Sequence, residues 1–294
     1  MRPFTYAAPQ SLQEALDLLA KANGTVRPLV GGTDLIDQLR QRRKTADVVL
    51  DIKRIPEMHR LEYVAREGLH VGAAVSCADT AAFAAVRELY PAIRASCLLV
   101  GSVQIQNRAS IAGNVCNSAP SADTVPPLVT LDARAAIVGP RGRREVPLEE
   151  FFTGPGQNVL RGDELLLEIV VPPPAPHSSN HYLRFIPRNE MDIAVAGVSS
   201  LVALRPRGRI CARARIALAA VAPTPVRAKA AEAVLEGHVV TSELIEAAAE
   251  KAVEACRPIT DVRGSAEYRK ELVKVLTRRT LRHCMASLGQ PLES

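Results

Sequence analysis

The chain has 294 residues, 47% hydrophobic and 23% charged, so it is long enough for two folded domains and too apolar for a disordered protein. It has five Phe, five Tyr and no Trp, which argues against a nucleic-acid surface built from stacked aromatic rings. The net charge of +6 includes arginine clusters at residues 40–44, 141–144 and 205–209. We interpret these clusters as solvated turns and helix ends in preference to a nucleic-acid surface, and docking of an acidic protein partner is a further alternative.

A helix is predicted near the N-terminus, because Ser11 and Glu14 form a capping box and Gly24 follows the last apolar position. A small βαβ-like unit comes next. After it, the pattern changes to short strands between Leu61 and Ala73. The predicted elements from residue 26 to residue 171 are a strand at 26–30, a helix at 33–43, a strand at 46–52, the short strands within 61–73, helices at 79–90 and 91–100, an extended segment at 109–117, a helix at 122–131, and strands at 134–138 and 164–171.

Four prolines within residues 172–176 cannot belong to a central strand, so we place a domain boundary there. Downstream, residues 192–204 and 211–221 predict a hairpin that turns at 205–209. Three helices are expected after it, at 225–236, 242–256 and 266–288.

Cysteine and histidine spacing argues against a metal site. No two of the six cysteines stand closer than 19 residues, and the six histidines form no ligand pattern. We therefore predict neither metal ligands nor catalytic residues in this chain, and we expect the cysteines to be buried, reduced thiols of a cytoplasmic protein. The N-terminus lacks an apolar signal core, and no apolar run is long enough to span a membrane.

The segment Val30-Gly31-Gly32-Thr33-Asp34 lies between a predicted strand and a predicted helix. Its glycines permit close backbone approach, and the first N–H groups of a helix are unpaired, so the turn suits a pyrophosphate. An ordinary strand-to-helix turn is the alternative. The Thr33 hydroxyl is expected to bind phosphate, to cap the helix, or to do both. A diphosphate repels Asp34, so residue chemistry alone places this carboxylate in the first helical turn, where it favours the helix.

The segment from Gly101 to Asp123 combines small residues, amide side chains and one carboxylate, a composition that a hydrophobic core does not need. It lets a backbone approach a flat, phosphate-bearing ligand. Asp123 either accepts hydrogen bonds from ribose or ribityl hydroxyls or caps the predicted helix. The sequence has no phosphate-binding loop of the Gly-x-x-x-x-Gly-Lys type and no Gly-x-Gly-x-x-Gly that opens a βαβ unit, so these two segments would have to hold a nucleotide.

In this order, the two segments resemble the FAD-binding loops of the flavin subunits of molybdenum hydroxylases, the family of xanthine dehydrogenase and carbon monoxide dehydrogenase. The likeness covers nearly the whole chain and includes residues 126–133, 148–156, 162–166 and 188–194. It implies an α+β fold. A two-lobed FAD-binding domain of the vanillyl-alcohol-oxidase (PCMH) type is expected at 1–176, with lobes at about 1–57 and 58–176, and an α+β domain of antiparallel sheet plus helices at 177–290.

The resemblance also implies which residues contact FAD. They are Leu29, Val30, Gly31, Gly32, Thr33, Asp34, Leu35, Val100, Ala109, Ser110, Ile111, Gly113, Asn114, Asp123, Leu166 and Arg184. Val100 and Leu166 match apolar contacts to the flavin rings. Arg184 stands where several relatives carry a lysine, and a fixed positive charge there would stabilise reduced flavin and raise its potential. Residues 186–195 resemble the loop that flanks the flavin.

By the same resemblance, the chain is the FAD-binding electron-transfer subunit of a molybdenum hydroxylase complex. Electrons enter from a small [2Fe-2S] subunit and leave to an external acceptor such as NAD+, a quinone or O2, while a large molybdopterin subunit performs the hydroxylation. The expected assembly is a dimer of heterotrimers. A stand-alone FAD-dependent oxidase or dehydrogenase is the alternative, but it would need a substrate-activating base that the sequence does not reveal. A scaffold subunit would leave the two small-residue segments unexplained.

Overall fold

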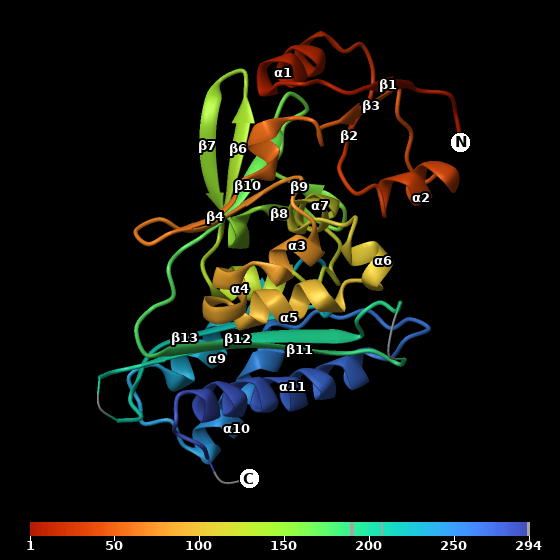
Figure 1. The fold of residues 1–294 in the computed structure, drawn as a ribbon. Coiled ribbons are helices and arrows are strands. Elements are labelled where there is room, and N and C mark those ends of the chain that lie inside the picture. Colours follow the sequence, from red (N-terminus) through yellow and green to blue (C-terminus); the bar gives the residue numbers. More distant parts are fainter. Residues whose placement is uncertain (189–190, 207, 293–294) are drawn as a thin grey trace.

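The computed structural model describes residues 1–188, 191–206 and 208–292. Figure 1 shows a small N-terminal lobe, a larger second lobe, and a C-terminal sheet covered by long helices. The mixture of parallel and antiparallel sheets with separate helical layers confirms the α+β class.

The N-terminal lobe is a three-stranded parallel sheet with two helices. Across the sheet the strands are β1 (Thr5–Ala7), β3 (Val48–Asp51) and β2 (Val26–Leu29). One half of the predicted capping box of helix α1 (Leu12–Lys21) is confirmed, because Ser11 Oγ accepts from the N–H of Glu14 at 3.2 Å; the Glu14 carboxylate accepts from the N–H of Gln10 instead of Ser11, at 2.7 Å. Helix α2 (Leu35–Arg40) is shorter than predicted, since the backbone turns left-handed at Arg42, with φ 60°.

The second lobe is a five-stranded antiparallel sheet packed against short helices. In spatial order its strands are β4 (Leu61–Val64), β5 (Gly68–Gly72), β10 (Leu165–Val171), β6 (Arg134–Gly139) and β7 (Gly142–Pro147). Its other elements are η1 (Pro56–His59), α3 (Cys77–Ala82), α4 (Ala84–Leu89), α5 (Pro91–Leu99), α6 (Val103–Gln106), α7 (Ile111–Asn117), α8 (Val125–Thr130), η2 (Leu148–Glu150), β8 (Phe152–Gly154) and β9 (Gln157–Asn158). One continuous apolar core joins this sheet to its helices and to α1.

The C-terminal part is a four-stranded antiparallel sheet, β11 (Ser178–Phe185), β12 (Ala196–Leu204), β13 (Cys211–Ala219) and β14 (Val226–Arg227). Its helices are α9 (Lys229–Leu235), α10 (Ser242–Ala252), η3 (Val253–Ala255) and α11 (Ala266–Ser287). Figure 1 shows this sheet between the helices of the second lobe and α11. The predicted hairpin and the three helices are therefore present, although Arg207 in the predicted turn lies outside the described residues.

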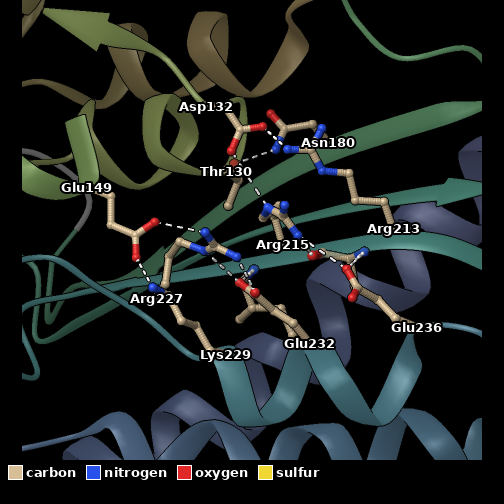
Figure 2. A network of polar contacts seen from close by, with 12 residues as sticks. Thr130, Asp132, Glu149, Asn180, Arg213, Arg215, Arg227, Lys229, Glu232 and Glu236 are labelled. Carbon is tan, nitrogen blue, oxygen red and sulfur yellow. Dashed lines mark hydrogen bonds and ion pairs between the residues drawn. The ribbon is translucent and has the colours of Figure 1, made fainter. Parts of the chain in front are cut away.

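A polar seam joins the second lobe to the C-terminal sheet (Figure 2). On the lobe side, Asp132 pairs with Arg213 and lies 3.6 Å from Arg215, while Glu149 accepts from Arg227 at 2.8 Å. The seam also contains neutral contacts: the hydroxyls of Thr130 and Ser199 lie 3.0 Å apart, and the amide of Asn180 donates to Thr130 at 2.9 Å. These contacts hold the C-terminal sheet in a defined orientation against helix α8.

The prediction of an extended segment at 109–117 is wrong. Residues 111–117 form helix α7, whose N-cap Ser110 accepts from the N–H of Gly113 at 3.0 Å. Ile111 and Val115 are fully buried, and the helix packs on β10. Tertiary packing therefore overrides the weak helix propensity of a segment that contains Gly113 and Asn114.

The short segment 162–166 contains a buried carboxylate that links β7 to the loop before β10. Glu164 accepts from the Arg144 guanidinium at 2.7 Å and 3.0 Å and from the N–H of Arg161 at 2.9 Å. Its side chain is 5% exposed, and the Arg144 contact, opposed by burial, lowers the pKa of Glu164 to about 2.

We expect Glu164→Gln to lower the free energy of unfolding by up to about 3 kcal/mol at pH 7. The depressed pKa means that this stabilisation is complete above about pH 4.5, the ordinary value, and is lost as the pH falls toward 2. Denaturant melts of both proteins between pH 7 and pH 2.5 should therefore converge at low pH. A difference in stability that does not depend on pH would contradict this account.

Candidate cofactor site

The first small-residue loop connects β2 to α2 and needs both of its glycines. Gly32 has φ +73°, a conformation that side chains rarely adopt, and a Cβ there would lie 2.9 Å from Leu29 Cδ1 and from Ile36 Cδ1. A Cβ on Gly31 would lie only 2.0 Å from the carbonyl oxygen of Arg108. The loop therefore presents bare backbone at both positions.

The contact at Gly31 brings the two predicted loops together. Arg108 and Ala109 directly precede α7, so Gly31 of the N-terminal lobe rests on the start of the second loop. The N–H groups of Gly32, Thr33 and Asp34 make no hydrogen bond to a backbone carbonyl within the described residues. Two segments almost eighty residues apart thus form one surface with several free backbone donors.

The first turn of α2 shows whether Thr33 caps that helix. The N-cap residue is Asp34, which makes no side-chain capping hydrogen bond, so Thr33 does not cap the helix. Burial of part of the Asp34 carboxyl raises its pKa, and nearby Lys44 partly offsets this rise. Leu35 begins the helix, and Val30 lies half-buried at the end of the strand.

The second loop is buried at residues 109–112, where it leads into helix α7. Ser110 is 2% exposed and caps α7, while Ala109 accepts from the N–H of Cys77 at 2.7 Å. Asn114 Oδ1 accepts from the Thr124 hydroxyl at 2.7 Å, which links α7 to the turn before α8. The loop that was predicted to line a nucleotide is therefore the first turn of a short helix.

Asp123 does not cap helix α8, so of its two predicted roles only the contact with ribose or ribityl hydroxyls stays a prediction. Thr124, not Asp123, is the N-cap of α8. Both carboxylate oxygens instead face strand β11: Tyr182 donates to Oδ1 at 2.8 Å and Arg184 donates to Oδ2 at 2.5 Å. Asp123 is 9% exposed, so this contact between the second lobe and the C-terminal sheet is buried.

One hydrogen-bond donor of Arg184, its Nε–H, has no partner among the described residues. The Nε is buried, and the Arg184 side chain as a whole is 4% exposed. A buried, unsatisfied guanidinium N–H is costly unless a ligand or water accepts from it. Tyr182 was not among the predicted contacts, although its spacing of two residues from Arg184 on a strand places both side chains on one face.

The two predicted apolar contacts lie on different elements. Val100 ends α5 half-buried, and the next residue, Gly101, accepts from the N–H of Met191 at 3.4 Å. The described part of the predicted flanking loop, 186–188 and 191–195, thus reaches the end of α5, whereas Asn189 and Glu190 lie outside the described residues. Leu166 is 4% exposed in β10, the strand on which α7 packs.

A cavity of about 340 Å³ opens beside the first loop. Val30, Lys53, His59, Ser76, Asp79 and Arg108 are among the residues that line it. It therefore adjoins both loops where they meet, a feature that no local sequence pattern indicates.

Residues 1–188, 191–206 and 208–292 contain no helix with the length and apolarity needed to cross a bilayer, and no group of three or more His, Cys, Asp or Glu side chains arranged to hold a metal ion.

Comparison with known proteins identifies the family. The family described as "FAD binding domain in molybdopterin dehydrogenase" matches residues 2–174, and "CO dehydrogenase flavoprotein C-terminal domain" matches residues 181–284. The xanthine dehydrogenase FAD-binding subunit of Escherichia coli O157:H7 is 30% identical over 98% of both chains. The carbon monoxide dehydrogenase medium chain of Hydrogenophaga pseudoflava is 32% identical over 95% of this chain and 96% of that one.

Solved structures agree. Carbon monoxide dehydrogenase from Hydrogenophaga pseudoflava lacking the Mo-pyranopterin moiety matches with a TM-score of 0.92 at 32% identity, over 97% of this chain and 99% of that one. Quinoline 2-oxidoreductase from Pseudomonas putida 86 matches with a TM-score of 0.90 at 27% identity, over 98% of both chains. The chain therefore belongs to the FAD-binding subunits of the molybdenum hydroxylases, which are oxidoreductase subunits with FAD as their cofactor.

Proposed function

We propose that this chain carries FAD where its two small-residue loops meet and transfers electrons within a molybdenum hydroxylase complex. The observation that carries the proposal is the contact of Gly31 with Arg108, which joins the loops through bare backbone. The unpaired Nε of buried Arg184 also fits a ligand with hydrogen-bond acceptors. FAD supplies the redox chemistry, and the protein binds, orients and electrically tunes it.

Each predicted contact then has a structural role. The backbone of residues 29–35 would hold the pyrophosphate, and Ala109, Ser110, Ile111, Gly113 and Asn114 would line the nucleotide from the first turn of α7. Asp123 and Arg184 would face the cofactor from the junction with β11, while Val100 and Leu166 would offer apolar contact. The proposed domains are 1–176, with lobes at about 1–57 and 58–176, and 177–290.

We further propose that a [2Fe-2S] subunit delivers electrons to this chain, that a molybdopterin subunit hydroxylates the substrate, and that NAD+, a quinone or O2 accepts the electrons. Relatives named for xanthine, carbon monoxide and quinoline support this division, because similar FAD subunits serve different substrates. The proposed assembly is a dimer of heterotrimers. A cytoplasmic location agrees with six unpaired cysteines, five of them buried.

We expect the purified protein, alone or with the subunits that co-purify, to be yellow and to release all of its flavin on acid precipitation. Burial raises the pKa of Cys116, the cysteine within the second loop, to about 12, which disfavours the thiolate that a covalent flavin link would need. Absorbance of the supernatant and chromatography against FAD and FMN standards check this. Flavin that remains in the pellet would show a covalent link, and a colourless protein that takes up no added FAD would overturn the proposed function.

A further inference from the structure

The positive charge of Arg184 is paired at very short range. Its guanidinium lies 2.5 Å from Asp123 Oδ2, and the two side chains are 4% and 11% exposed. At a distance of several ångströms, an ion pair acts as a dipole whose field falls off faster than that of a single charge. A neighbouring cofactor would therefore experience much less than one full positive charge.

Tyr182 holds the other carboxylate oxygen. Its hydroxyl donates to Asp123 Oδ1 at 2.8 Å, and the side chain is 1% exposed. The position of the hydroxyl depends on Gly197 of β12, where a Cβ would lie 2.9 Å from it. In the β11–β12 register, Arg184 is opposite Gly197 and Tyr182 is opposite Ser199, so one strand face delivers two donors to two oxygens.

We propose that Asp123 sets the effective charge that Arg184 presents to FAD, with Tyr182 as a positioning residue that holds Asp123 in place. The inference rests on the proposed function and changes its expected electrostatics: Arg184 acts as one half of a dipole instead of as a free cation. The orientation of this dipole then sets the reduction potential of the flavin. The carboxylate destabilises the reduced, anionic flavin, whereas the guanidinium stabilises it.

The test is the midpoint potential of bound FAD in full-length variants. Asp123→Asn should raise the potential by at least about 30 mV, which for a two-electron couple is a tenfold change in the ratio of reduced to oxidised affinity. Arg184→Gln should lower it, and the double variant should return close to the wild-type value. Tyr182→Phe should shift the potential in the same direction as Asp123→Asn but by less.

One control separates tuning from structure. Tyr90→Phe removes another buried hydroxyl, which donates to the Pro172 carbonyl at 2.9 Å, and should shift nothing. If Asp123→Asn and Arg184→Gln shift the potential in the same direction, or not at all, the inference is overturned while FAD binding stands. Wild-type protein that binds no FAD overturns both.

Discussion

Replacing Gly31 with alanine should weaken FAD binding by about a hundredfold or more, equivalent to about 2.7 kcal/mol. A Cβ at this position would stand 2.0 Å from a backbone oxygen, which cannot rotate away as a side chain can. The two loops must then separate by an ångström or more, and the free N–H groups of one loop lose their alignment with the other. Titration of the apoprotein with FAD, followed by flavin fluorescence, measures the loss.

Gly162→Ala is the matched control. Gly162 is exposed, and a Cβ there would meet nothing within 4 Å. This variant should bind FAD like the wild type, with an unchanged melting temperature. Equal FAD affinity in Gly31→Ala and Gly162→Ala would show that the cofactor does not lie where the loops meet.

The chain without its partners should oxidise no N-heterocycle, aldehyde or aromatic CoA thioester, and activity should appear when its iron–sulfur and molybdopterin subunits are added. We expect this because the described residues provide loops for a flavin but no clustered metal ligands and no evident substrate-activating base. Turnover is measured with an artificial electron acceptor, and metal content is assayed in the same sample.

The complementary measurement uses the assembled complex. An acceptor that takes electrons upstream of FAD should sustain hydroxylation even when FAD has been removed from this chain. Robust oxidation of substrate by the metal-free chain would instead favour the stand-alone flavin oxidase.

The sequence predicted the elements with strong local signals. The capping box at Ser11 and Glu14, the proline-rich break at 172–176 and the three C-terminal helices all depend on residues close together in the chain. Helix α7 was missed because its only start signal is Ser110, and Gly113 stands where a capping box would have an acid or amide. Packing on β10 decides its conformation, and packing is not a local property.

In the candidate site, too, contacts between residues distant in the chain could not be predicted from the sequence. The small-residue composition identified both loops, but their contact depends on Gly31 meeting Arg108, a pairing that no spacing reveals. Asp123 was assigned to a hydroxyl or a helix cap because its partners, Tyr182 and Arg184, lie about sixty residues further along the chain. The FAD contacts themselves stay predictions.

The ion pairs between the second lobe and the C-terminal sheet follow the order of synthesis. Asp132 and Glu149 of the seam (Figure 2), together with Asp123, are made first, and their partners Arg213, Arg227 and Arg184 follow. Until the second half emerges, these three carboxylates have no arginine partner from the C-terminal sheet, and each ion pair then attracts only within about a Debye length. Docking of the C-terminal sheet during refolding should therefore slow as ionic strength rises, which stopped-flow refolding in increasing salt would detect.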